Sequence, residues 1–319
     1  MNSRMSASPT GSISLEGDVF ERALFPTDFS AYSTAVLKCL PDLRTVGLRD
    51  VVLLHVIPPD QVPLGHGVDR ELLEKLQWTN RQKLDLMRIA LEGQGFSVRC
   101  RLEEGNPAVE IVHLAQEERV QLIVMGAQGK SLIQEFLLGS VAWEVVRHAR
   151  VPVLVEKFDT IRELGDVHCR KVCAESFKIV LHPTDFSDCA NAAFHIVKQL
   201  KLAGTEQVVL LHVQDERAMK YRPQEQKDEF DREDMSRLEK MRQTLALNGL
   251  PSKVLLRNGI PFAEALKVAE EENVSLIVLG TRGRSLIAEL LSGSTFENVI
   301  RYSRRPVLAL PSPRPGDWF

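Results

Sequence analysis

The sequence predicts an α/β protein built from two tandem domains, each a parallel sheet with helices on both faces. Most of the chain is written twice, because residues 20–30 (FERALFPTDFS) match residues 177–187 (FKIVLHPTDFS). The segment VVLLHV occurs at 51–56 and again at 208–213. Short apolar runs alternate with amphipathic stretches, and the runs are apolar throughout, as strands are when helices cover both faces of a sheet.

The elements of the first copy follow from this alternation. The expected strands are residues 23–28, 51–57, 96–102, 122–126 and 151–156. The expected helices are residues 30–46, 69–93, 107–119 and 140–148. The third helix has the clearest start, since Asn106 can cap it and Pro107 suits its first turn.

The repeat also predicts the domain boundaries. Residues 105–126 match 259–280 with a shorter offset than the earlier segments, so the length difference falls between about 57 and 105, where loops tolerate it. We predict domains at 19–156 and 176–311, joined by a linker at 157–175. The Ser-rich residues 1–18 predict a disordered tail without the apolar core of a signal peptide, and residues 312–319 predict a Pro-rich tail.

Composition narrows the class of protein. The formal net charge is −3, which gives no electrostatic reason to expect nucleic acid or an anionic membrane as partner. No apolar run approaches the roughly 20 residues of a membrane helix. Five cysteines are an odd number, which indicates reduced thiols and predicts a cytoplasmic protein.

A glycine pattern recurs at matched positions, in GAQGKSLIQEFLLGS (126–140) and GTRGRSLIAELLSGS (280–294). Its first glycine follows a predicted strand, at the edge where parallel sheets bind ligands. Glycines there let backbone N–H groups approach an anion, and the closing Gly-Ser opens a helix with free donors. The pattern predicts a phosphate cradle. The alternative is simple helix capping, because Ser294 stands three residues before Glu297.

The spacing of the glycines does not match that of other nucleotide-binding motifs. The stretch GKS at 129–131 resembles the end of a P-loop, but Val124 stands where the earlier glycine would be required. Asp28 and Asp185 end the first strand of each copy in PTDFS, and either can bind a ribose or base or can cap the following turn. Recurrence on the same edge as the glycines favours a ligand.

Each half resembles the universal stress protein (UspA-like) domain, specifically its ATP-binding branch. The resemblance rests on PTDFS, LLHV, the Gly-x-Pro before the third helix, and the G-x2-G-x9-G-S pattern followed by a helix and PVL. It implies a Rossmann-like, adenine nucleotide alpha hydrolase-like domain with a five-stranded parallel sheet of order 3-2-1-4-5. It further implies that residues 151–155 and 305–310 pair antiparallel, forming a pseudo-dimer within one chain, and that two chains can associate further.

The resemblance also implies which residues bind ATP. Asp28 and Val56, with Pro26 and Thr27 of the same motif, would contact adenine and ribose, with Met125 and Gly126 nearby. The phosphate contacts implied in the first copy are Gly129, Gly139, Ser140 and Val141, with Lys130 as the nearest cation. The matching residues of the second copy are Pro183, Thr184, Asp185, Val213, Leu279, Gly280, Gly283, Arg284, Gly293, Ser294 and Thr295.

The function implied is a stress-response protein that holds two nucleotides with little turnover and acts as a regulator or sensor. ADP and AMP share the adenine and ribose contacts and stay open as ligands, with Mg²⁺ as a possible companion. The alternatives are a slow Mg-dependent ATPase or phosphotransferase, and a scaffold for an unknown protein partner with one empty site. His55 and His212 are interpreted as core histidines. His168, Cys169 and Cys173 are a zinc or redox candidate, although they offer only three ligands and their spacing is not that of a recognised zinc finger.

Overall fold

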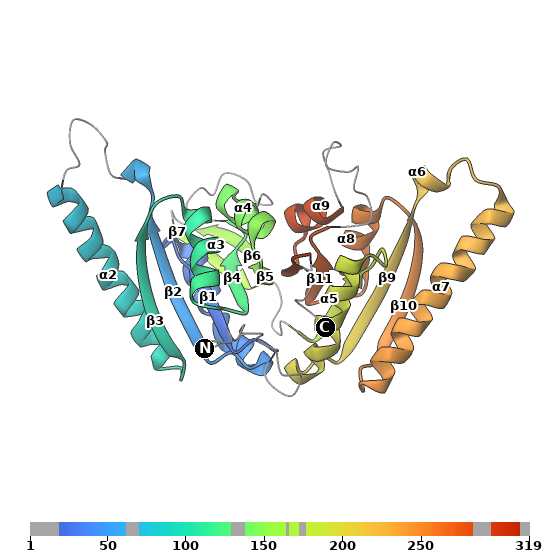
Figure 1. Cartoon of the computed structure of the whole chain (residues 1–319), viewed down its shortest axis with the longest axis horizontal. Helices are drawn as coiled ribbons and strands as arrows, with labels where there is room; N and C mark the ends of the chain where they lie inside the picture. The colour runs from blue at the N-terminus through green and yellow to red at the C-terminus, as the bar shows by residue number, and fades with distance from the viewer. Residues whose placement is uncertain are drawn as a thin grey trace, which may run out of the picture.

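The computed structural model describes residues 19–61, 70–128, 138–163, 166–171, 177–282 and 295–312. Among them, ten strands form one sheet of order β10-β9-β8-β11-β12-β5-β4-β1-β2-β3, with helices on both faces (Figure 1). Each half of this sheet has the predicted order 3-2-1-4-5. The two predicted α/β domains are therefore confirmed, and they share a single sheet.

The first half closely follows the predicted elements. Its strands are β1 (Arg22–Pro26), β2 (Asp50–Ile57), β3 (Ser97–Glu104), β4 (Leu122–Gly126) and β5 (Val153–Glu156). Its helices are α1 (Ala31–Leu37), α2 (Arg70–Glu92), α3 (Pro107–Glu117) and α4 (Ser140–His148), with the short 3₁₀ turns η1 (Leu40–Val46) and η2 (Pro59–Gln61). Asn106 caps α3 as predicted, since its side chain accepts from the N–H groups of Ala108 and Val109.

The second half repeats the first. Its strands are β8 (Ile179–Pro183), β9 (Gln207–Asp215), β10 (Ser252–Gly259), β11 (Leu276–Gly280) and β12 (Val307–Leu310). Its helices are α5 (Asp188–Gln199), α6 (Glu216–Met219), α7 (Gln224–Leu247), α8 (Pro261–Glu271) and α9 (Thr295–Tyr302), with the 3₁₀ turn η3 (Leu200–Ala203). Buried positions match between copies: Asn80, Leu84 and Leu91 of α2 correspond to Asp234, Leu238 and Leu245 of α7.

One predicted helix is divided. Residues 30–46 form α1 and then the 3₁₀ turn η1, which contains Pro41. Proline has no N–H to donate and disfavours helical geometry in the residue before it, so the α-helix ends upstream of it.

The halves meet at an antiparallel pair of strands. Val307, Leu308 and Ala309 of β12 lie opposite Val155, Leu154 and Val153 of β5, whereas pairing within each half is parallel. Trp143 of α4 stacks on Phe296 of α9 across the same seam, with ring centroids 6.5 Å apart. The pairing expected from the resemblance is thus present, and it closes two apolar strand edges that would otherwise invite aggregation.

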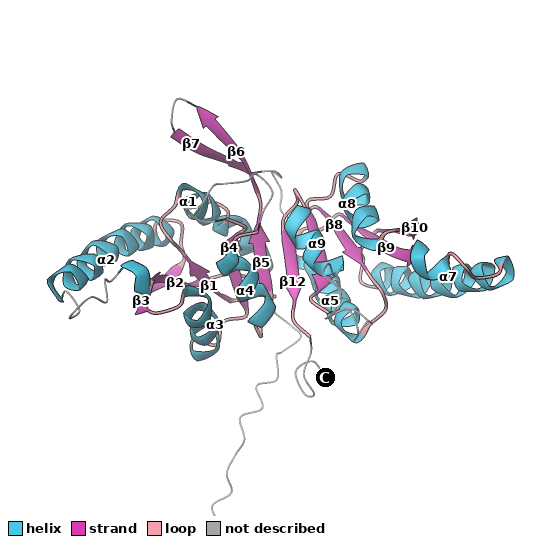
Figure 2. Cartoon of the chain, turned by 90° about the horizontal axis from the view of Figure 1, so that it is seen from above, coloured by secondary structure: helices cyan, strands magenta, loops and turns pink. Residues whose placement is uncertain are grey.

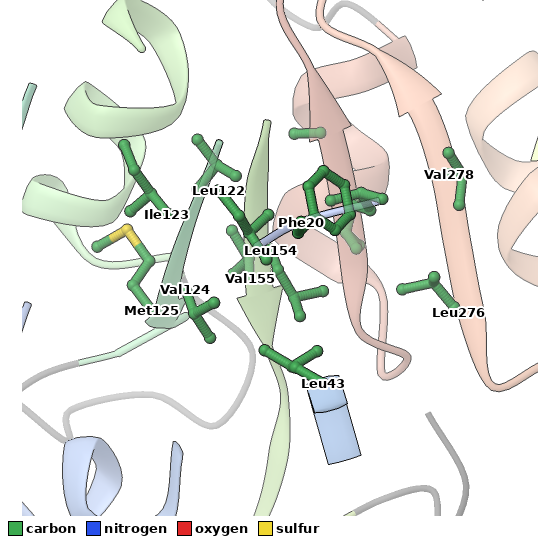
Figure 3. Close-up of a cluster of buried hydrophobic side chains, with 14 of the residues drawn as sticks. Phe20, Leu43, Leu122, Ile123, Val124, Met125, Leu154, Val155, Leu276 and Val278 are labelled. Carbon is green, nitrogen blue, oxygen red and sulfur yellow. The ribbon is translucent and has the colours of Figure 1, made fainter. Parts of the chain in front are cut away.

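The apolar core runs through this seam without interruption. Leu154 and Val155 lie between Leu122 and Val124 of the first half and Leu276 and Val278 of the second (Figure 3). All six side chains are buried. The halves therefore share one core, so a substitution that leaves a cavity on one side of the seam should destabilise both halves.

The predicted linker contains a hairpin that the sequence analysis does not anticipate. Strands β6 (Phe158–Glu163) and β7 (Asp166–Lys171) pair antiparallel and extend away from the body of the molecule (Figure 2). The N–H of Phe158 donates to Tyr32 Oη over 3.1 Å, and the two rings meet edge to face. This contact attaches the base of the hairpin to α1.

None of the helices in the described parts of the chain combines the length and apolarity of a membrane span.

A buried lysine links the halves beside the seam. The side chain of Lys157 is almost fully buried, and its Nζ donates to the carbonyl of Ile300 over 2.8 Å. Ile300 lies near the C-terminus of α9, where a cation is favourable. Burial lowers the pKa of Lys157 to about 8.

We predict that Lys157 makes stability depend on pH in the alkaline range. The amine binds its proton more weakly in the folded chain than in the unfolded one, so folding is penalised below pH 8 and the penalty disappears as pH rises toward 10.5. The free energy of unfolding of the native chain, relative to Lys157→Met, should therefore rise between pH 8 and 10 by at most about 3 kcal/mol. Urea denaturation of both proteins at several pH values measures the difference, and parallel profiles would contradict it.

Candidate functional site

The residues predicted to bind nucleotide follow neighbouring strands whose carboxyl ends diverge. β1 pairs with β4 only at Ala23↔Leu122 and Leu24↔Ile123, and β8 pairs with β11 only at the matching two positions. The carboxyl ends of these neighbours therefore diverge. This is the point in an open α/β sheet where the strand order reverses and ligands bind. We call the residues that follow β1 and β8 the first rim (residues 27–30) and the second rim (residues 184–187).

The first rim is a turn held by its own side chains. The N–H of Phe29 donates to Thr27 Oγ1, and the N–H of Ser30 donates to Asp28 Oδ1, both over 3.0 Å. Phe29 adopts a left-handed backbone conformation with φ 59°. Ser30 then caps α1 by accepting from the N–H of Ser33. This geometry carries the chain sharply from the strand into the helix.

The second rim reproduces these contacts. Phe186 has φ 59°, its N–H donates to Thr184 Oγ1, and the N–H of Ser187 donates to Asp185 Oδ1 over 3.0 Å. Both aspartates therefore serve the turn, which is one of the two roles that the sequence left open. The turn bond occupies one acceptor site on Oδ1 of each carboxylate, and an ionised carboxylate has about four such sites, so the turn is compatible with a ligand.

Each rim is contacted by the ring of one histidine. His55 Nδ1 lies 2.7 Å from the carbonyl of Thr27, and His212 Nδ1 lies 2.7 Å from the carbonyl of Thr184. Each ring also contacts the phenyl ring of its own rim, with centroids 4.3 and 4.6 Å apart. Both histidines have a structural role, as interpreted, and they contact the very residues predicted to bind nucleotide.

The start of α4 is bonded to the end of β4. The N–H of Gly139 donates to the carbonyl of Ala127 over 2.7 Å, and the N–H of Ala127 donates to the carbonyl of Glu156. Gly139 precedes the helix without a side-chain cap, so the first N–H groups of α4 are suited to an anion. Ser140 is exposed at this end and Val141 is half-buried.

The remaining predicted residues lie at the same edge of the sheet. Val56 lies one residue before the end of β2, and Met125 and Gly126 end β4. Val213, Leu279 and Gly280 are the matching residues of the sequence repeat in the second half. Thr295 is exposed at the start of α9. The predicted residues Gly129, Lys130, Gly283, Arg284, Gly293 and Ser294 lie outside the described residues.

Two of the glycines have a packing role that the sequence does not reveal. A Cβ at Gly280 would come within 2.9 Å of backbone atoms of Cys189 in α5, and a Cβ at Gly126 within 2.5 Å of the Tyr32 ring. Any larger residue there would push α1 or α5 away from the sheet. Close helix packing is therefore a sufficient reason for glycine at both positions.

Sequence reasoning missed a second buried histidine near the second rim. His182 of β8 stands where the first half has Phe25, and its Nδ1 lies 2.9 Å from the carbonyl of Val278 on β11. Full burial lowers the pKa of His182 to about 4, so the ring is neutral at pH 7 and Nδ1 carries the proton. The Phe-to-His difference inside an otherwise matched segment is the signal that would have drawn attention to it.

Within the described residues, no three His, Cys, Asp or Glu side chains are grouped so as to hold a metal ion. The candidate zinc or redox residues are not tested by this. The structure describes only the backbone of His168 and Cys169, in β7, and Cys173 lies outside the described residues.

Known proteins share this arrangement. A profile of the universal stress protein family matches residues 20–157 and 176–311. The universal stress proteins MJ0577 and MJ0531 of Methanocaldococcus jannaschii are 35% and 31% identical to the chain over 153 and 144 residues. The matches cover 94% and 84% of those relatives but 42% and 44% of this chain, so each relative corresponds to about half of it.

A solved structure extends the likeness to both halves. The crystal structure of a universal stress protein from Archaeoglobus fulgidus is 28% identical, with a TM-score of 0.70, and covers 92% of this chain and 97% of its own. The fold defines a tandem Rossmann-like α/β protein. The chain belongs to the universal stress protein family, as the sequence resemblance indicated.

We predict that each rim aspartate stabilises its turn through its hydrogen-bond acceptor and not through its negative charge. In Asp28→Asn the side-chain oxygen can still accept from Ser30, so stability without nucleotide should change by less than about 0.5 kcal/mol. In Asp28→Ala this acceptor is lost, and the cost should be about 0.5–2 kcal/mol, as for a lost helix cap. Urea denaturation measures both, with Asp185→Asn and Asp185→Ala as the matched pair. Equal stability of the Asn and Ala variants would show that the turn bond contributes nothing.

Proposed function

We propose that this universal stress protein binds adenine nucleotide, ATP in the first instance, at both rims and acts as a regulatory or sensor protein in stress response. The observation that carries the proposal is the duplicated turn: two halves with different surfaces keep the same Thr–Asp–Phe–Ser hydrogen bonds and the same left-handed phenylalanine. A turn required only for folding could use many sequences. A ligand bound by both halves explains why the same turn sequence occurs in each of them.

The rim supplies the polar contacts that a nucleoside requires. The carboxylate of Asp28 or Asp185 can accept hydrogen bonds from ribose hydroxyls or adenine, and the apolar ends of β2 and β4 offer surface for the base. Lys83 and Arg237 lie over the rim phenyl rings at 5.1 and 5.4 Å, which brings a positive charge to each rim. ADP and AMP share these contacts.

The phosphates would lie at the start of α4 and α9. Backbone N–H groups of the first helical turn and the hydroxyl of Ser140 are suited to phosphate oxygens. Mg²⁺, if bound, would be held by the phosphates together with that hydroxyl. We further propose a cytoplasmic location, because the odd number of cysteines, five in the sequence, indicates reduced thiols.

We predict that the purified chain binds two adenine nucleotides, and that Asp28→Asn and Asp185→Asn each weaken one site. Loss of a charge-assisted hydrogen bond of about 1.5–3 kcal/mol corresponds to at least tenfold weaker binding. Isothermal titration with ATP and Mg²⁺ measures stoichiometry and affinity. Glu239→Gln is the control, because it removes a charge on α7 that pairs with Arg242 at the surface.

The same preparation tests turnover. A stoichiometry near two with ATP unchanged over hours supports a binding role, whereas steady release of ADP favours the slow ATPase. A stoichiometry of one indicates an empty site. No binding of ATP, ADP or AMP at either rim would refute the proposal.

A further inference from the structure

Helix α2 carries apolar side chains on two opposite faces. On the face against the sheet, Leu84 and Leu91 are buried. On the opposite face, Trp78, Leu86 and Ile89 are 66%, 70% and 58% exposed. At 3.6 residues per turn, their spacing of eight and then three residues places these three side chains in one row along the outer side of the helix. We call Trp78, Leu86 and Ile89 the α2 stripe.

The α2 stripe is not a requirement of the fold. A surface helix ordinarily has polar side chains on the face that points to water, and a row of exposed apolar side chains typically marks a site of association. The matched helix of the second half has the ordinary pattern. At the corresponding places in α7 it carries Arg232, Lys240 and Gln243, and all three are exposed.

The position of the stripe favours a closed pair of chains. Helices α2 and α7 lie at opposite ends of the long axis of the chain (Figure 1). Apolar stripes at both ends would allow chains to join end to end without limit. A stripe at one end that packs against its own copy about a two-fold axis gives a dimer and stops there.

The open edge of the sheet beside α2 is protected against association. Strand β3 is the last strand at this end, and Arg101 on it pairs with Glu103, Glu117 and Glu118 at 3.0, 3.2 and 2.7 Å. Charged side chains on an edge strand oppose the addition of another strand. The helix face, and not the strand edge, is therefore the surface suited to association at this end.

The charges beside the stripe complement themselves in an antiparallel pair of helices. The N-terminal half of α2 carries Lys75 and Arg81, and the C-terminal half carries Asp85 and Glu92. Arg88 lies 3.3 and 2.9 Å from these two acids, which leaves one net negative charge there. In an antiparallel pair the N-terminal half of each helix lies against the C-terminal half of the other, so charges of opposite sign meet.

The apolar residues determine the register of the pair. A two-fold axis between residues 83 and 84 places Trp78 of each copy opposite Ile89 of the other. The same register places Arg81 of each copy next to Asp85 and Leu86 of the other. Because the axis relates the two helices, each of these contacts occurs twice.

The other charges of α2 do not oppose this register. Arg70 and Glu74 pair with each other at 3.3 Å within the first turns. The position opposite Glu71 is residue 96, which lies beyond the end of α2. Lys83 lies 5.1 Å from the centre of the Phe29 ring, on the side of the helix toward the first rim.

We propose that the outer face of α2 is a self-association surface, at which two copies of this chain form an antiparallel dimer through the α2 stripe. Aromatic side chains bury up to about 250 Å² each, so the two copies of Trp78 contribute at most about 500 Å². With the aliphatic side chains the interface lies at the low end of specific interfaces, below about 1,200 Å². The expected dissociation constant is therefore about 1–100 μM.

Sedimentation velocity of the full-length chain, from about 1 to 200 μM, tests the dimer. We expect a monomer–dimer equilibrium. Trp78→Arg and Leu86→Lys install the residues of α7 at exposed positions, so both variants should fold, which urea denaturation verifies. Trp78→Arg should weaken the dimer at least about thirtyfold, as for a central aromatic residue of an interface, and Leu86→Lys should weaken it in the same direction.

The matched control is Arg232→Ala, which changes the place in α7 that corresponds to Trp78 and should leave the dimer unchanged. A native chain that stays monomeric over the whole concentration range would refute the proposal. A dimer that Trp78→Arg leaves intact would refute it equally, because another surface would then hold the two copies together.

A charge swap tests the antiparallel register. Arg81→Asp sets two acids against each other at both copies of the contact, and Asp85→Arg sets two cations against each other. Each variant alone should dimerise about three- to tenfold more weakly than the native chain. An equimolar mixture restores opposite charges at both contacts, so the mixed dimer should form with about the native affinity. A mixed dimer no tighter than the dimers of the single variants would refute this register.

A lipid surface is the other occupant that an exposed apolar helix face would suit. Cosedimentation with phosphatidylcholine vesicles measures it. A native chain that is monomeric and binds these vesicles, with binding lost in Trp78→Arg, would overturn the second copy as the occupant. None of these measurements requires nucleotide, so the association surface stands or fails independently of the proposed function.

Discussion

The antiparallel pairing of β5 with β12 is the constraint on which the rest of the molecule depends. It places the two inner strands in register through three buried pairs, and everything else in each half is fixed relative to those strands. Because the core is continuous across the seam, neither half can shift without exposing apolar surface. The two rims are therefore held at a fixed separation by the sheet itself, and not by a flexible connection.

The order of strands and helices was predictable because the apolar runs are strong and occur twice. Local features that need only one residue, such as Asn106 capping α3, were predictable for the same reason. The hairpin β6–β7 was not, since its strands are only six residues long and carry charged or polar residues at most positions. Phosphate binding by the loop glycines also stays a prediction, because Gly129, Gly283 and Gly293 lie outside the described residues.

The approach of His212 Nε2 on β9 to within 3.3 Å of Asp234 Oδ2 on α7 was beyond the reach of sequence reasoning. Asp234 lies in a 24-residue helix that is charged along most of its length, and such a helix suggests exposure at every position. Which residue turns inward depends on the phase of the helix against the sheet. Once the structure gives that phase, Asn80 of α2 and Asp234 of α7 are seen to be matching buried residues, an amide in one half and a carboxyl group in the other.

Joining two copies in one chain also frees the interface from symmetry. In a symmetric dimer of identical subunits every substitution at the interface appears twice, so each contact must be compatible with its copy related by the two-fold axis. Here Lys157 reaches across the seam to Ile300, while the place matching Lys157 in the second half is taken by Pro311, which can make no such contact. The fused chain can therefore have a hydrogen bond on one side of the seam without a counterpart on the other. A symmetric pair of identical subunits could not maintain this asymmetry.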